Sequence, residues 1–314
     1  MASTTPPPEV SVALCTFNGE RYLRQQLDSV LAQQDVALDV VALDDGSTDA
    51  TGAILDEYAT RDPRLRWQAN PRNLGPTASF ERAMALCRGP YIAPCDQDDV
   101  WQPRKLAELR AAVGDADLVY CDSVYVDAQG RASGGRVSQA TAMLAGTNPI
   151  AWLFTNSVSG HASLVRRDLF EQARPFPVGA YHDWWLALCA AGRNGVRYLD
   201  RALVDYRRHE NAHSGMGRSS SGRSRTAAAS RTWLDERHAL MRAYAGTSLR
   251  RHEIAAALAQ ALDEALGSGR GAPLRRLLWR HRDLLPAWTG IAALDAFKLQ
   301  RRLATKLRRA RMAG

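Results

Sequence analysis

The sequence lacks three features that would assign the chain to common classes of protein. No stretch of about 18 or more uncharged apolar residues occurs, so no segment is predicted to span a membrane. Residues 1–9 lack a basic segment followed by an apolar core, so they predict a flexible N-terminus and not a signal peptide. Neither a GxGxxG fingerprint nor a GxxxxGK[ST] loop is present, which argues against a dinucleotide dehydrogenase and a phosphate-loop ATPase.

Cysteine is scarce, with five residues in a chain of 314. The cysteines are scattered through apolar surroundings and form no close CxxC pair, so they predict buried thiols in a reducing cytoplasm. The apolar content of 46% and the charged content of 24% are those of an ordinary globular protein. The length allows one large domain or two smaller ones.

Positive charge is concentrated at the C-terminal end of the chain. The formal net charge is +8, but residues 270–314 hold twelve Lys or Arg against two acids, a net charge of +10. The remaining 269 residues therefore sum to −2. The basic character belongs to a C-terminal region and not to the part of the chain that carries the acidic motifs.

The first half of the chain alternates strand and helix patterns. This alternation predicts a parallel sheet covered by helices on both faces, with ligands bound outside the carboxyl ends of the strands. Ser47 or Thr48 is predicted to cap the second helix. The predicted strands are residues 10–15, 36–43, 64–68 and 90–95, and the predicted helices are residues 20–33, 49–60, 77–87 and a segment from about residue 103.

Polar clusters follow three of these strands, at residues 16–19, 44–49 and 96–99. Each cluster alone is typical of a turn followed by a helix cap. Three clusters along one sheet edge instead favour a binding crevice. The carboxylates within residues 96–99 repel one another, so they predict a hard divalent cation with oxygen ligands; an acidic helix N-terminus is the alternative.

Four segments, residues 12–18, 44–49, 73–75 and 96–99, resemble the family 2 glycosyltransferases in residues, order and spacing. The resemblance implies an α/β fold of the GT-A type, a mostly parallel sheet flanked by helices, here with a helical basic C-terminal extension. It also implies a bound Mg²⁺ or Mn²⁺. It implies these donor-site roles: Thr16, Phe17 and Asn18 line the nucleoside pocket, Asp44 or Asp45 receives the base, Arg72 or Asn73 lies near the ribose or phosphate, Asp96 approaches the ribose, and Asp98 binds the metal with support from Asp99.

The middle of the chain resembles the acceptor side of the same family. Residues 159–165 correspond to the acceptor segment, which makes His161 a candidate acceptor contact. Asp183 opens a predicted helix, where the family has its general base; by itself this residue is equally a helix cap. Trp184 or Trp185 is expected to stack on a sugar, with the other in the core. No second carboxylic acid is required, because the metal stabilises the leaving nucleoside diphosphate.

A basic segment follows the predicted strand of residues 202–206. Residues 206–211, Tyr-Arg-Arg-His-Glu-Asn, resemble a signature of bacterial rhamnosyltransferase-like members of the family. The resemblance makes His209 a further metal ligand and Arg207 or Arg208 a phosphate contact, whereas the alternative is a solvated basic turn. The Gln-x-x-Arg-Trp motif of processive synthases is absent, so one sugar is expected to be transferred at a time.

These patterns divide the chain into a catalytic domain, a linker and a helical region. Apolar and basic residues interleave in the last 45 residues, which suits either a helix on an anionic membrane surface or a solvated helical hairpin. The predicted units are residues 10–213 as the catalytic domain (10–121 the nucleotide-sugar half, 122–213 the acceptor half), residues 214–231 as a linker or lid, and residues 232–314 as the helical basic region.

The predicted function is that of a metal-dependent, inverting glycosyltransferase of bacterial surface polysaccharide synthesis. The favoured donor is dTDP-L-rhamnose, with UDP-hexose as the alternative, and the acceptor is a saccharide or a lipid-linked saccharide. The predicted location is the cytoplasm, peripheral at the inner face of the cell membrane. A nucleotidyltransferase lacks support because no Gly-rich basic triphosphate loop is visible. A nucleic-acid-binding protein would explain the basic tail, but the tail lacks a recognisable binding module, so no nucleic-acid partner is expected.

Overall fold

The computed structural model describes residues 7–209, 226–287 and 290–311. Most of the predicted linker, residues 214–225, lies outside the described residues, as do residues 1–6 of the predicted flexible N-terminus. The strands alternate with helices in the first half of the chain, as predicted. They are β1 (Val10–Thr16), β2 (Leu38–Asp44), β3 (Leu65–Ala69), β4 (Tyr91–Cys95), β5 (Val100–Trp101), β6 (Leu118–Val126), β7 (Ala132–Arg136), β8 (Ser163–Arg166) and β9 (Val196–Arg207).

The described strands form one mixed sheet in the order β3-β2-β1-β4-β8-β6-β9-β5, with β7 paired to β6. The part built from β3, β2, β1 and β4 is parallel throughout, as the alternating pattern predicts. Strand β8 enters antiparallel to both β4 and β6, and β6 and β9 are parallel to each other. The sheet thus joins a parallel half that ends in the polar clusters to a mixed half that comes from the middle of the chain.

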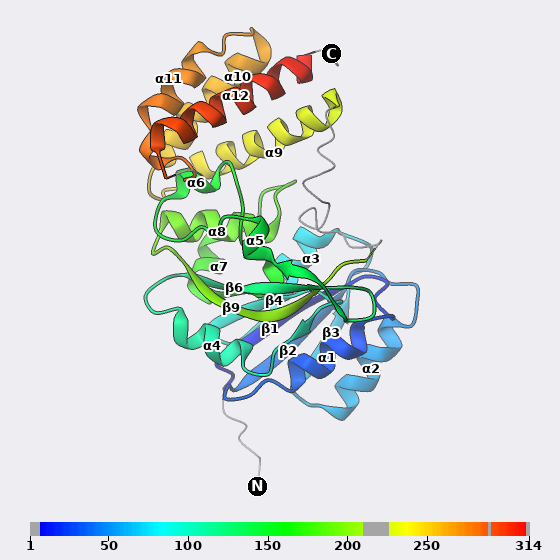
Figure 1. Cartoon of the computed structure of the whole chain (residues 1–314). Helices are drawn as coiled ribbons and strands as arrows, with labels where there is room; N and C mark the ends of the chain where they lie inside the picture. Colours follow the sequence, from blue (N-terminus) through cyan, green and yellow to red (C-terminus); the bar gives the residue numbers. More distant parts are fainter. Residues whose placement is uncertain (1–6, 210–225, 288–289, 312–314) are drawn as a thin grey trace.

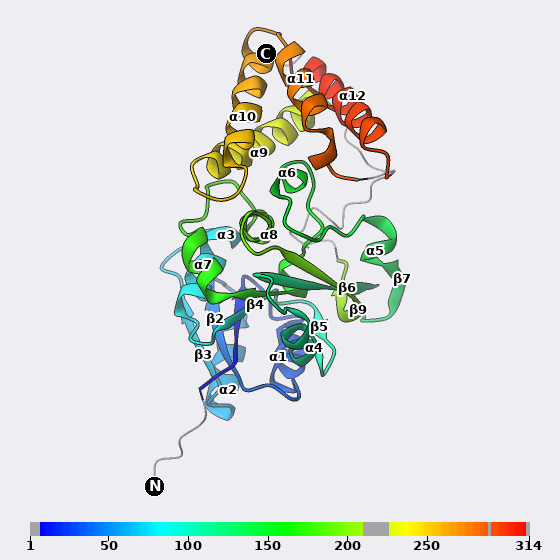
Figure 2. The ribbon, with the colours of Figure 1, turned by 90° about the vertical axis from the view of Figure 1, so that its left-hand side faces the viewer.

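Helices cover both faces of the sheet (Figures 1 and 2). One apolar core lies between the sheet and α1, α2 and α4, and the other lies between the opposite face and α3, α7 and α8. Both faces of β1 are buried, which explains its nearly continuous apolar sequence. These helices and two short ones are α1 (Leu23–Leu31), α2 (Thr51–Arg61), α3 (Pro76–Leu86), α4 (Lys105–Ala112), α5 (Val137–Ala140), α6 (Pro149–Trp152), α7 (Arg167–Ala173) and α8 (His182–Gly192), with a 3₁₀ turn η1 (Gly160–Ala162).

The predicted cap of the second helix was wrong. Helix α2 follows Ala50, which makes no side-chain cap bond, and Asp49 Oδ1 accepts the Thr51 N–H at 3.0 Å instead. Ser47 is engaged elsewhere, because its hydroxyl donates to Asp44 and accepts the N–H of Asn18. Ser47, which the local sequence pattern assigned to the helix cap, is therefore hydrogen-bonded at the strand ends instead.

The C-terminal helices form a layer that stacks on α8, at the end of the molecule away from the N-terminus (Figure 1). Their apolar residues belong to the same core as α3, α7 and α8, so no break in packing separates this layer from the sheet. Among the described residues, no helix combines the length and the apolar character needed to cross a bilayer. The layer consists of α9 (Ala227–Ala245), α10 (His252–Gly267), α11 (Ala272–Arg280), η4 (Arg282–Leu284) and α12 (Ala292–Arg311).

Candidate active site

The carboxyl ends of β1, β2 and β4 lie side by side, because β1 pairs in parallel with both of its neighbours. Polar side chains at these ends bind one another across the strands. Thr16 Oγ1 donates to Asp44 Oδ1 at 2.9 Å, and the N–H of Asn18 donates to Ser47 Oγ at 2.8 Å. The first two predicted polar clusters therefore meet at one edge of the sheet.

Gln97 joins the third cluster to the first. Its Oε1 accepts the N–H of Phe17 at 2.8 Å, and its Nε2 donates to the carbonyl of Phe17 at 3.0 Å. The Phe17 ring remains 38% exposed, and Asn18 and Asn73 are exposed as well, whereas Thr16 is buried. The structure thus leaves an aromatic ring and two amides exposed at this edge of the sheet, on a backbone held by hydrogen bonds.

Both carboxylates predicted to receive the base are only 4% exposed. Asp44 is held by Thr16 at the end of β1. Asp45 accepts three hydrogen bonds, from Asn70 Nδ2 at 2.7 Å and from the N–H groups of Leu74 and Gly75 at 2.8 and 2.9 Å. Asp45 therefore fixes the loop that carries Asn73 against the end of β2.

The two predicted metal ligands lie in direct contact. His209 follows the end of β9, and its Nε2 is 2.7 Å from Asp98 Oδ2. The two side chains are 13% and 19% exposed, so solvent or a ligand reaches both. This contact joins residues 111 positions apart in the sequence.

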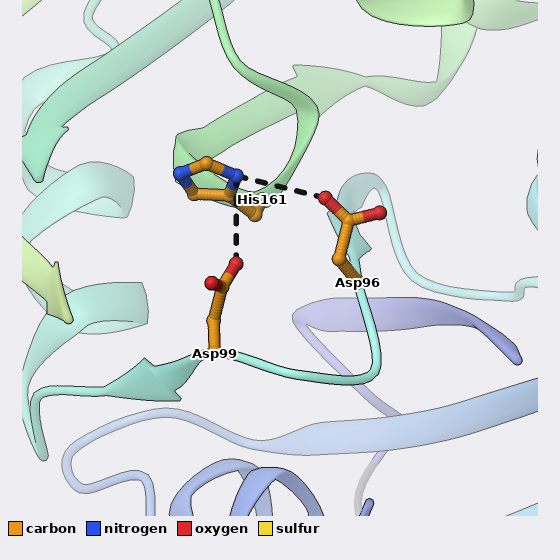
Figure 3. A group of neighbouring side chains, drawn as sticks. All are labelled: Asp96, Asp99 and His161. Atoms are coloured by element: carbon orange, nitrogen blue, oxygen red, sulfur yellow. Dashed lines mark ion pairs between the residues drawn. The ribbon is translucent and has the colours of Figure 1, made fainter. Parts of the chain in front are cut away.

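A second group of ligand-type atoms lies beside this pair and consists of Asp96, Asp99 and His161 (Figure 3). His161 Nδ1 is 3.6 Å from Asp96 Oδ2 and 3.5 Å from Asp99 Oδ2. The imidazole is only 3% exposed and stacks on Tyr206, with ring centroids 4.5 Å apart. His161 is therefore an internal contact between the two carboxylates, in place of the acceptor contact expected from the sequence.

Burial and charge shift the pKa values of this group. Burial, with the charges of Asp98 and Asp96 added, raises the pKa of Asp99 to about 7. Burial opposes the charged form of His161, but the Asp99 and Asp96 carboxylates outweigh it and raise the pKa of the imidazole. Burial likewise opposes the charge on Asp96, and His161 overcomes it and lowers the pKa of Asp96. An ionised Asp96 beside an imidazolium is therefore favoured.

Lys105 is a buried cation behind the acidic group. Its side chain is 0% exposed, Nζ donates to the carbonyl of His161 at 2.6 Å, and Nζ lies 3.0 Å from the Trp101 ring centroid. Burial lowers the pKa of Lys105 to about 8, against the opposing pull of nearby thiols and carboxylates. Sequence patterns gave no sign of this residue, because nothing local marks a lysine at a helix start as buried.

Arg207 does not face the crevice as a phosphate ligand would. The side chain is 2% exposed, Nε donates to the carbonyl of Asp98 at 2.8 Å, and Nη2 donates to Gln25 Oε1 at 2.8 Å. Its backbone N–H donates to Asp99 Oδ1 at 3.0 Å. The predicted phosphate contact is thus contradicted for Arg207, whose guanidinium holds the acidic loop in place, while Arg208 beside it is exposed.

These residues fit a hard divalent cation. Carboxylate oxygens suit Mg²⁺ and Mn²⁺, and an imidazole nitrogen can complete such a set. Asp98 and His209 offer one oxygen and one nitrogen at contact distance. Asp99 Oδ2 has no hydrogen-bond partner in the part of the chain that the structure describes and lies 3.5 Å from His161 Nδ1, so Asp99 is a second, buried carboxylate behind this pair.

Residues 11–174 match the profile of the family described as Glycosyl transferase family 2. This match covers more than half of the chain. The chain belongs to glycosyltransferase family 2. Similar proteins include an uncharacterized glycosyltransferase of Haemophilus influenzae, 26% identical over 66% of this chain and 68% of that protein. The succinoglycan biosynthesis protein ExoO of Rhizobium meliloti is 33% identical over 40% of this chain and 36% of its own length.

Solved structures agree with the GT-A fold of this family 2 glycosyltransferase. S. aureus TarS, solved with UDP-GlcNAc, superposes with a TM-score of 0.62 at 18% identity and covers 96% of this chain and 89% of that one. The mannosyltransferase PcManGT of Pyrobaculum calidifontis, solved with GDP-Man and Mn²⁺, gives a TM-score of 0.54 at 17% identity, with 98% and 88% coverage. At these identities the likeness establishes the fold.

Asp183 lies at the start of α8 in this glycosyltransferase. Its Oδ2 accepts the N–H of Gly160 at 3.2 Å, and Oδ1 accepts the N–H of Trp184 at 2.6 Å. Burial raises the pKa of Asp183, with the Asp96 charge acting in the same direction. Gly160, whose N–H Asp183 accepts, directly precedes His161, whose Nδ1 lies 3.6 Å from Asp96 Oδ2. The two carboxylates therefore lie in one neighbourhood, although 87 residues separate them in the sequence.

The two tryptophans after Asp183 are both core residues. Trp184 and Trp185 are 6% and 4% exposed, and their indole N–H groups donate to the carbonyls of Trp152 and Ala173 at 2.6 and 2.8 Å. Neither ring offers a face to a sugar, which contradicts the predicted stacking. The apolar residues of α8 repeat without a polar stripe, and this pattern was the available sign of a helix buried on all sides.

Proposed function

We propose that this glycosyltransferase moves one sugar from a nucleoside-diphosphate sugar to a hydroxyl of a saccharide or lipid-linked saccharide. The observation that carries the proposal is the meeting of Asp98 and His209 at the same sheet edge as the polar ends of β1 and β2. A diphosphate requires a cation, and a nucleoside requires a crevice with exposed ring and amide groups. Residues suited to both tasks lie at this edge of the sheet, which supports the proposal.

In the proposed donor site, Asp98 and His209 hold Mg²⁺ or Mn²⁺. The cation, when bound, would neutralise the two phosphates and stabilise the departing nucleoside diphosphate. Phe17 and Asn18 line the nucleoside, and Asp44 fixes the end of β2 beneath it. Asp96, kept ionised by His161, accepts hydrogen bonds from the ribose.

Asp183 acts as the general base in this proposal. It removes the proton from the acceptor hydroxyl while that oxygen attacks the anomeric carbon, and the nucleoside diphosphate departs on the opposite side. One base and one in-line displacement invert the anomeric centre. A carboxylate with a raised pKa is better matched to this proton transfer than an exposed one.

The donor we favour is dTDP-L-rhamnose, because residues 206–211 resemble the signature of rhamnosyltransferase-like members. UDP-hexose is the alternative, and TarS, solved with UDP-GlcNAc, supports it. A thermal-shift screen of nucleotide sugars, with and without Mn²⁺, tests both. A ligand present at about 100 times its dissociation constant stabilises the folded state by about 2.7 kcal/mol. A screen in which no nucleotide sugar shifts the transition in the presence of Mn²⁺ contradicts the proposed function.

We also propose a role in surface polysaccharide synthesis at the cytoplasmic face of the membrane. The similarity to a succinoglycan biosynthesis protein and the charge of +10 on residues 270–314 support this location. Cell fractionation tests it: the protein should pellet with membranes at low salt and leave them at high salt. Recovery entirely in the soluble fraction at low salt contradicts it.

A further inference from the structure

Four large apolar side chains are exposed near the turn between α11 and α12. Trp279 is 49% exposed, Ile291 60%, Leu294 40% and Phe297 50%. They are four of the seven large apolar side chains that are exposed among the described residues, although they lie within 19 positions of one another. These four residues are named the C-terminal apolar patch.

Packing of the two helices places the patch at one end of the hairpin. Gln300 Nε2 donates to the carbonyl of Arg275 at 3.3 Å, and α11 and α12 pack side by side in the C-terminal layer (Figures 1 and 2). Trp279 follows Arg275 by one turn, and Phe297 precedes Gln300 by one turn. Ile291, Leu294 and Phe297 recur every three residues, so they share one side of their segment.

Positive charge surrounds the patch. The Arg282 guanidinium lies 5.6 Å from the Trp279 ring centroid, and that of Arg301 lies 5.8 Å from the Phe297 ring centroid. Arg280 and Lys298 are exposed beside them.

The acids of the same segment do not balance this charge. Asp295 is only 1% exposed, which leaves Asp283 as the exposed acid of residues 279–301 among those that the structure describes. Exposed aromatic side chains with guanidinium groups close to them are typical of proteins that lie at a lipid interface.

We propose that the C-terminal apolar patch inserts into the headgroup region of an anionic lipid bilayer. This rests on the peripheral location proposed above and is independent of the sugar donor. A second copy of the chain would bring a tail of net charge +10 against an identical tail, which repels. Anionic headgroups instead meet the cations, while the rings and aliphatic side chains leave water.

Vesicle co-sedimentation of the full chain tests the proposal, with phosphatidylcholine vesicles that contain or lack phosphatidylglycerol. The wild type should bind the anionic vesicles at low salt and be released at high salt. The triple variant Trp279→Gln, Leu294→Gln, Phe297→Gln should bind at least about tenfold more weakly, because it loses apolar area that would leave water. Val178→Gln is the matched control, since Val178 is 98% exposed elsewhere on the surface.

Three outcomes overturn the proposal. The wild type fails to bind anionic vesicles at low salt; the triple variant binds them as the wild type does; or Val178→Gln weakens binding as much as the triple variant. If sedimentation velocity shows a dimer that only the triple variant dissociates, with vesicle binding unchanged, the patch is a protein interface instead. Circular dichroism should show that both variants remain folded.

His182 is the first residue of α8 and is buried. The side chain is 9% exposed, its ring stacks on Phe80 with centroids 3.9 Å apart, and Nε2 has no hydrogen-bond partner among the described residues. A Cβ at Gly160 would lie 2.5 Å from this nitrogen. Gly160 also donates its N–H to Asp183. The same glycine therefore contacts Asp183 and, because it has no Cβ, leaves space for the imidazole of His182.

A buried ring nitrogen without a partner is costly, so a ligand is the natural partner. Burial lowers the pKa of His182 while Asp183 and Asp96 oppose the shift, which favours a neutral ring that can share one hydrogen bond. His182 directly precedes Asp183 in the chain. In the proposed function the transferred sugar lies between Asp96 on the donor side and Asp183 on the acceptor side, next to this imidazole.

We infer that His182 Nε2 binds a hydroxyl group of the transferred sugar. The inference rests on the proposed function, because it needs a nucleotide sugar in the crevice. It assigns His182 a positioning role toward the sugar and none toward the nucleotide. Removing Nε2 should therefore weaken binding of the nucleotide sugar while binding of the matching nucleoside diphosphate stays unchanged.

Calorimetry with UDP, dTDP and their sugar conjugates, in the presence of Mn²⁺, tests this difference. His182→Leu should reduce affinity for the preferred nucleotide sugar by about tenfold, the effect of one hydrogen bond, and leave affinity for the diphosphate unchanged. His182→Gln, which places an amide near the position of Nε2, should restore part of the loss.

Equal losses for sugar conjugate and diphosphate show a structural role and overturn the inference, as does unchanged binding of the sugar conjugate by His182→Leu. A wild type that binds diphosphates and no sugar conjugate overturns the proposed function together with the inference. If the wild type binds its sugar conjugate and His182→Leu keeps the same preference for the conjugate over the diphosphate, the inference alone is overturned.

Discussion

The acidic crevice and the basic C-terminal layer use charge in opposite ways. In the crevice Asp44, Asp45, Asp99 and Arg207 are at most 4% exposed, and each has hydrogen-bonded partners in the strand ends around it. In the C-terminal layer most cations point into solvent from helices whose apolar sides are packed. Each of these charged side chains in the crevice is therefore held in one position by specific partners. The C-terminal cations instead act through their total charge.

The largest expected effect belongs to Asp183 in the crevice. Asp183→Asn keeps the shape but has one acceptor oxygen for the N–H groups of Gly160 and Trp184, and its amide cannot take up the proton of the acceptor hydroxyl. We expect transfer to fall by about 10²-fold or more, the scale of general-base catalysis, with donor affinity nearly unchanged. Turnover kinetics and calorimetry of the same variant measure the two quantities. Normal turnover on the true acceptor rules Asp183 out as the base.

Asp98→Ala should have the next largest effect. It removes one of two proposed cation ligands while leaving the core untouched, because the side chain is 19% exposed at a strand end. We expect the gain in UDP or dTDP affinity on adding Mn²⁺ to fall by about 10- to 100-fold, at least the scale for disturbing a metal site. Isothermal titration with and without Mn²⁺ measures it, and an unchanged gain would exclude Asp98 as a ligand.

Lys105 tests the comparison directly, because it is a cation buried within the acidic half. Its folded-state pKa of about 8 lies below the unfolded value of about 10.4, so the folded state binds fewer protons between these values and stability rises with pH. From about pH 7.5 to about pH 9.5 the wild type should gain about 2 kcal/mol relative to Lys105→Met. Urea unfolding at both pH values measures the gain.

Lys298→Met is the control for that experiment, since Lys298 is exposed in the C-terminal layer. The control should follow the wild type at both pH values. If Lys105→Met follows the wild type as well, the buried lysine titrates normally and the contrast between the two regions fails at this residue.

The smallest expected effect belongs to single cations of the C-terminal layer. Arg280→Gln should lower binding to anionic vesicles by about 1 kcal/mol, and further Arg→Gln changes should add similar amounts, all screened by salt. Vesicle sedimentation across a salt series measures the sum. One substitution that abolishes binding by itself would show a specific site and break the description of this region as a collective charge.

Sequence patterns predicted the parallel half of the sheet well, because buried parallel strands are short apolar runs and their polar ends are contiguous in sequence. The meeting of Asp98 with His209 followed from the family resemblance. The internal roles of His161, Arg207 and Trp184 did not follow, because each is decided by a partner far along the chain. The same holds for the antiparallel insertion of β8, whose neighbours in the sheet no local pattern indicates.

Burial of α8 has a consequence for motion. Ten of its eleven residues are buried, and Asp183 is the exception. Amide protons in such a helix exchange with solvent only through large-scale opening, so hydrogen exchange along α8 should be among the slowest in the molecule. The carboxylate at its start is thus mounted on a rigid support, and any rearrangement that brings the reacting atoms within range falls to the substrates and the loops around them.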